Sequence, residues 1–188
     1  SGGVLSHAPR REQSAKMLID SFLPEGITSL AVDSIFMMPQ LGVMANIENK
    51  EIAEQARVAA LEVFEKDCLI RLGTCVAPVG KLSGSEIPLQ VNLEFKNGEK
   101  KDIEVRYGEL IRIEAEYEEI KAVLTPAKGV DVGAGDGEQI STTIFGGQVG
   151  IVFDGRGRPL ENDASSSKRI SNLKKWSEAM NEYPEIGK

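Results

Sequence analysis

The sequence predicts an α+β protein in which a small α/β segment precedes a mostly antiparallel β-sandwich or barrel and a C-terminal helix. Apolar residues follow helical spacing as far as Lys66, and β-branched and alternating patterns begin after Asp67. Asn97-Gly98 lies between two alternating runs, as is typical of a β-hairpin. Helical spacing returns only near the C-terminus. We therefore expect three units, residues 1–66, 67–160 and 161–188.

The first unit is expected to be the end of an α/β lobe. Apolar residues from Ala15 to Phe22 share one helical face, and Leu23-Pro24 ends that helix. The short apolar run 29–33 is bounded by turn formers and predicts a buried strand. A short helix is expected within 36–45 and a longer one within 51–66. The buried stripe of the longer helix is expected to be Ile52, Ala56, Ala59, Ala60, Val63 and Phe64.

The second unit is expected to contain about seven or eight strands. Its centre is predicted to be a hairpin in which residues 142–145 and 149–153 pair across Gly146-Gly147. A turn of that kind needs a positive φ, which glycine supplies. In the terminal helix Ile170, Leu173, Trp176 and Met180 lie near one face, and Trp176 is expected to fasten the helix to the β unit.

Composition narrows the classes of partner. The net charge of −7 and the pI of about 4.9 argue against nucleic acid and anionic membranes, which attract positive surfaces. No apolar run approaches the roughly 20 residues of a membrane span, and no signal peptide is recognisable. With only Cys68 and Cys75, a cytoplasmic location is expected. Because the chain begins Ser-Gly-Gly without Met, we expect it to be a piece of a longer protein.

Gly2-Gly3 is the candidate cofactor-binding segment, because it leads directly into a predicted helix. Glycines let a planar base or a ribose approach the backbone, so a nucleotide contact is one interpretation. The alternative is a strand-to-helix turn in which glycine only relieves steric conflict.

The segment 154–159, Asp-Gly-Arg-Gly-Arg-Pro, is the sharpest local feature. Arg156 and Arg158 on a glycine loop could clamp a phosphate, a carboxylate or an acidic partner in bidentate fashion. The alternative is that Asp154 pairs with an arginine and holds the loop closed.

Other features carry weaker signals. The glycine-rich run 133–137 lacks the lysine and the following helix of a phosphate loop, so it is expected to be a turn or a bulge. His7 is the only histidine, and the two cysteines do not have zinc-type spacing, so no metal site is predicted. The sequence contains no complete catalytic constellation.

Several segments together resemble one protein family. SGGVLSHAP at 1–9 is similar to the adenosine-side motif of the superfamily of acetate and sugar kinases, heat-shock chaperones and actin. With LGTCVAPVG at 72–80, DVGAGDG at 131–137, GGQVGIVFDGRGRPL at 146–160 and the terminal helix, it resembles the C-terminal part of the glutamate mutase accessory protein MutL family. That family is unrelated to the mismatch-repair protein of the same name.

The resemblance implies an ATPase-type accessory protein that reactivates or chaperones an adenosylcobalamin-dependent mutase. Gly2 and Gly3 would lie against the adenosine of ATP. The phosphate-binding Asp-x-Gly-x-Thr loop and the catalytic acid of the superfamily have no counterpart here, so this chain alone is not expected to hydrolyse ATP. Two alternatives stay open: a non-enzymatic protein-binding or assembly module, and a piece of a hydantoinase-like hydrolase.

Overall fold

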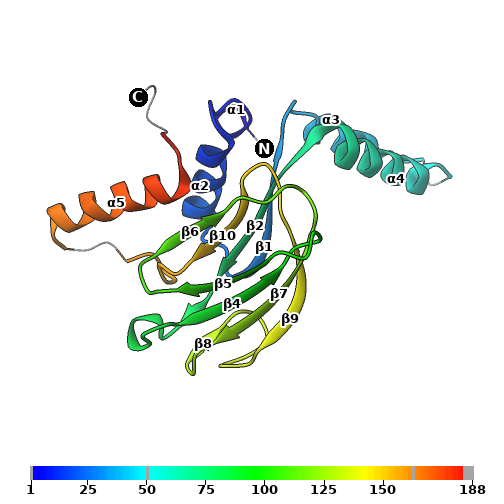
Figure 1. The fold of residues 1–188 in the computed structure, drawn as a ribbon. Helices are drawn as coiled ribbons and strands as arrows, with labels where there is room; N and C mark the ends of the chain where they lie inside the picture. The colour runs from blue at the N-terminus through cyan, green and yellow to red at the C-terminus, as the bar shows by residue number, and fades with distance from the viewer. Residues whose placement is uncertain (1, 50, 162–163, 184–188) are drawn as a thin grey trace.

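The computed structural model describes residues 2–49, 51–161 and 164–183. Two four-stranded sheets stack face to face, and helices pack on the outer face of one of them (Figure 1). Helices and mainly antiparallel strands share the chain, and a long helix follows the last strand. The predicted α+β class is therefore confirmed.

The first sheet carries the helices. Its strands, in spatial order, are β1 (Gly26–Asp33), β2 (Leu69–Ala77), β10 (Gly150–Asp154) and β6 (Leu110–Ile113). β10 runs parallel to β2, whereas the other neighbours are antiparallel. Ile151 and Phe153 face the second sheet, and Val152 faces the helices. Because both faces of β10 are covered, its apolar residues run without alternation.

The second sheet is antiparallel throughout. Its strands, in spatial order, are β5 (Lys100–Val105), β4 (Leu89–Glu94), β7 (Glu119–Pro126) and β9 (Ile140–Phe145). Gly98 has a φ of 85° between β4 and β5, so the Asn97-Gly98 hairpin is confirmed. Buried and exposed residues alternate along β4, which directs Leu89, Val91 and Leu93 into the core between the sheets. A short ribbon of β3 (Val79–Gly80) and β8 (Val130–Asp131) adjoins the sandwich.

The predicted central hairpin is wrong. β9 belongs to the second sheet and β10 to the first, so Gly146-Gly147 carries the chain across the sandwich. Neither glycine has a positive φ. They are needed for space instead: a Cβ on Gly147 would lie 2.5 Å from the carbonyl carbon of Leu72, and one on Gly146 would strike the oxygen of Glu116.

The first 66 residues contribute to the same sandwich as the rest. β1 pairs with β2 over its whole length, from Gly26 opposite Ala77 to Asp33 opposite Leu69. The predicted boundary after Lys66 therefore lies between two strands that share one ladder.

Two longer helices cover the first sheet. They are α2 (Arg11–Phe22) and α5 (Ser166–Met180), and the short α1 (Gly3–Ser6) packs beside α2. Ala15, Ile19 and Met180 are buried against the sheet, whereas Phe22, placed on the predicted apolar face, is 76% exposed. Trp176 Nε1 donates to the Gly108 carbonyl at 2.8 Å, so the predicted attachment of α5 is confirmed. No helix in the described ranges has the length and apolar content to cross a bilayer.

A helical arm, residues 34–68, interrupts the β1–β2 hairpin. It contains α3 (Met38–Ala45), α4 (Ala53–Val63) and a π-helical turn, η1 (Phe64–Cys68), and it projects away from the sandwich (Figure 1). Asp33 caps α3 by accepting from the N–H groups of Met37 and Met38. The predicted stripe of the longer helix is wrong in part, because Ile52 is 45% exposed and only Ala56 and Ala60 are buried. A single-turn 3₁₀ helix, η2 (Leu82–Gly84), follows β3.

We expect Gly147→Ala to lower the free energy of unfolding by at least about 2 kcal/mol, because the added methyl overlaps the β2 backbone. Gly84→Ala is the control, since a Cβ there meets nothing within 4 Å. Urea unfolding followed by circular dichroism measures both. Equal stabilities of the two variants would contradict the steric role of Gly147.

Candidate functional site

The end of β10 and the loop that follows it contain three of the residues singled out from the sequence, and the structure buries their side chains. Asp154 Oδ1 accepts from Arg156 Nε, and its Oδ2 accepts from Arg156 Nη2, both at 2.8 Å. Arg158 Nη2 donates to the same Oδ2 at 2.9 Å. The side chains of Arg156 and Arg158 are 1% and 3% exposed. Asp154 and both arginines therefore form a buried ion cluster, and neither guanidinium faces solvent.

Three other elements converge on this cluster. Arg156 Nη2 also donates to Asp20 of α2 at 2.8 Å, and its guanidinium lies 4.9 Å from the centroid of the Trp176 ring on α5. Arg158 Nε donates to the Pro24 carbonyl before β1 at 3.0 Å. Asp20 also pairs with Lys16 at 2.5 Å, so two carboxylates face two guanidinium groups and one ammonium group. The loop thus joins helices and sheet, which corresponds to the closed alternative for Asp154, Arg156 and Arg158.

The electrostatic surroundings of the cluster keep Asp154 ionised beside the two charged arginines. Burial alone would raise the pKa of Asp154, but the hydrogen bonds and charge of Arg156, with those of Arg158, hold that pKa below its ordinary value. Cys75, on neighbouring β2, shows the opposite balance. Burial, aided by the Asp154 charge and opposed by both arginines, raises the pKa of its thiol to about 12. A thiol with that pKa stays protonated near neutral pH and is no nucleophile.

Gly2-Gly3 lies on an open part of the surface. Gly2 has a φ of 139°, and a Cβ there would meet no atom within 4 Å. A Cβ on Gly3 would approach only the rim of the Phe36 ring, at 3.8 Å. Two hydrogen bonds attach the N-terminal segment to the body of the protein. Ser6 Oγ donates to the Asp33 carbonyl at 2.5 Å, and Ser14 Oγ donates to the Leu5 carbonyl at 2.7 Å.

A depression of about 470 Å³ opens beside Gly3. Its walls include His7, Pro9 and Met17 from the N-terminal segments and Tyr183 from the residues after α5. Gln13 Nε2 donates to the Glu182 carbonyl at 3.3 Å and joins the two parts of the wall. Flat and apolar side chains beside exposed glycine backbone can accommodate a planar ring. Gly2-Gly3 and this depression together are the candidate functional site.

The glycine-rich run 133–137 and His7 both make contacts that stabilise the fold. Asp131 accepts from the N–H groups of Gly133 at 2.6 Å and Gly135 at 2.9 Å, so the glycine-rich run is a turn organised by that carboxylate. These backbone hydrogen bonds lower the pKa of Asp131. His7 packs edge-on against Phe36, with 5.4 Å between ring centroids. In the part of the chain that the structure describes, no group of His, Cys, Asp and Glu side chains is placed to hold a metal ion.

Sequence reasoning missed two features. Asp20 lies on α2 among residues with no functional pattern, so nothing in the sequence indicates that it completes the ion cluster 136 residues away. The outward apolar residues of the arm were also missed: the sequence analysis named only Ile52 and Val63 among them, and it predicted both to be buried.

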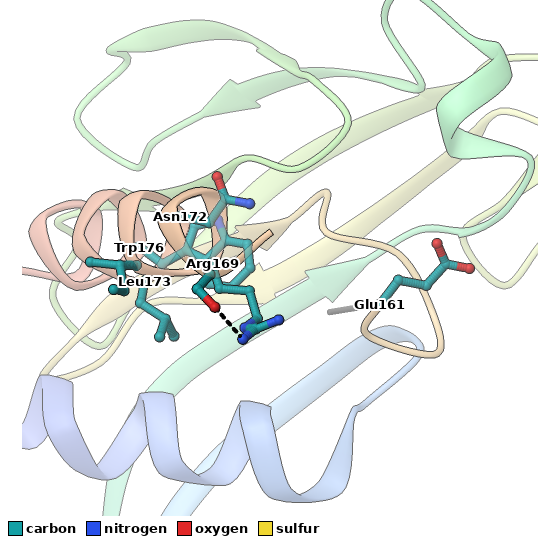
Figure 2. A pocket seen from close by; sticks show the side chains of 7 residues that line it. Glu161, Arg169, Asn172, Leu173 and Trp176 are labelled. Atoms are coloured by element: carbon teal, nitrogen blue, oxygen red, sulfur yellow. Dashed lines mark hydrogen bonds between the residues drawn. The ribbon is translucent and has the colours of Figure 1, made fainter. Parts of the chain in front are cut away.

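A second hollow, of about 330 Å³, lies beside α5 (Figure 2). Arg169, Leu173 and Trp176 line it from the helix, and Glu161 lines it from the loop after β10. Arg169 is held along its own helix by donating to Ser166 Oγ at 3.0 Å. Neither Gly2-Gly3 nor the buried ion cluster lines this hollow.

We expect Asp154→Asn to lower the free energy of unfolding at pH 7 by about 3–5 kcal/mol, because it leaves buried arginine charge uncompensated. The folded-state pKa of Asp154 is depressed, so its contribution exists above the unfolded-state pKa, about 4, and is lost as pH falls through the folded-state pKa. The difference between variant and wild type should therefore shrink in acid.

Urea unfolding at pH 7 and at low pH measures this difference. Exposed Asp102→Asn is the control, and it should change stability by no more than about 0.5 kcal/mol. A loss for Asp154→Asn that is the same at both pH values would contradict the linkage.

Comparisons with known proteins supply no family for this chain. Protein-family models, curated proteins and solved structures were compared with it, and none matches. A proposal about function therefore depends on the geometry above and on the motifs of the sequence.

Proposed function

We propose that this chain is the C-terminal part of a MutL-like ATPase accessory protein for an adenosylcobalamin-dependent mutase, and that Gly2-Gly3 contacts the adenosine of ATP. In this proposal the phosphate-binding loop and the catalytic acid come from an upstream half of the same protein. The chain would then form one wall of a nucleotide cleft and would not hydrolyse ATP by itself.

The observation that carries the proposal is the accessibility of Gly2 and Gly3. Gly2 has a φ of 139°, which by itself favours glycine, whereas Gly3 has no positive φ and no neighbour close enough to require a glycine. Here Gly2 has open space and Gly3 has a single distant neighbour. The absence of side chains at these positions therefore keeps backbone accessible from outside, as a nucleotide wall requires.

We expect Gly3→Trp to weaken nucleotide binding at least about tenfold in the longer protein that includes the upstream half, because the indole would occupy the space of the adenine. The surroundings of Gly3 are open, so the fold should tolerate the substitution. Isothermal titration with a non-hydrolysable ATP analogue measures the affinity.

Gly84→Trp is the matched control, because its Cβ also meets open space but lies outside the candidate site. Unchanged nucleotide affinity in Gly3→Trp, with the fold intact, would remove Gly3 from the site. Absence of nucleotide binding by the unsubstituted longer protein would remove the ATPase assignment altogether.

The mutase part of the proposal is tested separately. We expect an immobilised adenosylcobalamin-dependent mutase to retain the longer protein, and ATP to change the amount retained, since the proposed accessory role couples nucleotide state to mutase binding. Surface plasmon resonance with and without ATP measures this. Lack of retention in both states would exclude the mutase as partner and leave the nucleotide proposal standing.

A second candidate function is an assembly module that binds protein without nucleotide. The arm favours it, because apolar side chains on α3 and α4 point to solvent although the rest of the described chain has two well-covered cores. The buried ion cluster does not favour docking through Arg156 and Arg158. Binding of a protein by the chain while nucleotide titration stays negative would support this candidate over the first.

A further inference from the structure

The arm has a small core, and many of its apolar side chains are exposed. Its interior consists of Leu41, Ala60 and Cys68 with a few partly buried neighbours. Nine large apolar side chains of the arm are at least 37% exposed, and they are Ile35, Met38, Val43, Met44, Ile47, Ile52, Val58, Leu61 and Val63. Large exposed apolar patches on a folded protein often mark interaction sites.

Part of this surface is an apolar groove of about 370 Å³ between α3 and α4. Met38, Leu41 and Gly42 line it from α3, and Leu61 and Phe64 line it from the other side. Arg57 is the one charged residue in the lining, and it pairs with Glu54 at 3.4 Å. A groove between two helices with apolar walls fits an amphipathic helix.

The charges near the groove indicate which charge a helix that binds there should carry. α3 contains no charged residue, whereas residues 53–68 contain four acidic and two basic residues, a net charge of −2. Glu54 pairs with Arg57, and Glu65 is exposed one turn beyond Leu61, although neither carboxylate lines the groove itself. The negative net charge of this helical segment favours a partner helix that carries cations beside an apolar stripe.

Helix α5 has that pattern. It carries four basic residues and one acidic residue, a net charge of +3. Ile170 and Leu173 lie on one face and are 55% and 54% exposed. At 100° per residue, Arg169 and Lys174 flank this pair on opposite sides. The first half of α5 projects from the body, since its attachments, through Trp176 and Met180, lie in the second half (Figure 1).

The two surfaces lie on opposite sides of one molecule (Figure 1). α5 therefore cannot reach the groove of its own chain, and only another copy can supply it. Although each copy has a net charge of −7, charges more than about 8 Å apart are largely screened at physiological ionic strength, so the facing patches decide the contact.

We propose that the α3–α4 groove binds helix α5 of a second copy of this chain. The contact joins two different surfaces, so each bound copy still offers one free groove and one free helix. Association is then head to tail and continues into open chains or closes into a ring. An interface of one helix in one groove is small, and its dissociation constant is expected on the order of 10–100 μM.

The experiment uses sedimentation velocity of residues 1–188 over a concentration series. Wild type is expected to show a mass that rises with concentration beyond that of a dimer. Leu61→Asp in the groove and Leu173→Asp on the helix should each raise the dissociation constant at least about tenfold, because each places a charge in the apolar contact. Both positions are more than half exposed, so both variants should fold.

Mixing separates this proposal from other modes of association. Leu61→Asp retains an intact helix and Leu173→Asp an intact groove, so their equimolar mixture should form a dimer that does not grow further. Phe22→Asp, at an even more exposed apolar residue outside both surfaces, should associate like wild type.

Three results would overturn the proposal: a wild type that stays monomeric at concentrations well above the expected dissociation constant, variants that associate like wild type, or a mixture that stays monomeric. Circular dichroism and thermal unfolding confirm that each variant is folded. Nucleotide is absent throughout, so failure here is distinct from failure of the nucleotide proposal.

Discussion

The buried ion cluster around Asp154 is the interaction on which the arrangement of helices and sheet depends. Removing a carboxylate from water is costly, and only full hydrogen bonding compensates for that cost. Asp154 receives that compensation from the side chains of Arg156 and Arg158. Those arginines in turn reach Asp20 and the Pro24 carbonyl, so satisfying one carboxylate fixes α2 and the start of β1 relative to β10.

The rest of the interior follows from the position of β10. Because this strand has one sheet neighbour on each side, a second sheet on one face and helices on the other, any shift of its register would disturb every layer. The glycines before it, Gly146 and Gly147, allow the chain to cross between sheets where backbones approach too closely for a Cβ. The loop and the crossing together fix the central strand at both ends.

Local patterns predicted much of the fold. Alternation in β4 and Asn97-Gly98 gave the correct hairpin, because both signals act between neighbours in sequence. Gly146-Gly147 was misinterpreted because two strands joined by glycines have the same local pattern whether they pair in one hairpin or belong to different sheets. Only their long-range pairing distinguishes the two cases. Periodicity likewise predicted a buried stripe on α4, of which only Ala56 and Ala60 are buried, because periodicity carries no information about what covers a helix face.

The candidate site was predictable to a similar extent. The sequence singled out Gly2 and Gly3, and the structure leaves the space at their Cβ positions open, whereas a ligand at this segment stays a prediction. For the arginine loop the sequence left two alternatives open, namely arginines that bind a ligand and a loop held closed by Asp154. A carboxylate two residues before Arg156 is compatible with both. Solvent access decided between them, and that depends on Trp176 and Asp20, which are distant in sequence.

The way the arm is inserted has a consequence for the architecture as a whole. Its two ends leave the sheet at Asp33 and Leu69, which are opposite each other in one antiparallel ladder, and Ser34 closes the base by donating to the Cys68 carbonyl. The strand partners thus meet at the same spacing whatever lies between them. The pairing of β1 with β2 therefore does not depend on the length or sequence of residues 34–68. This segment can be shortened, lengthened or replaced by another recognition element while the sandwich stays the same.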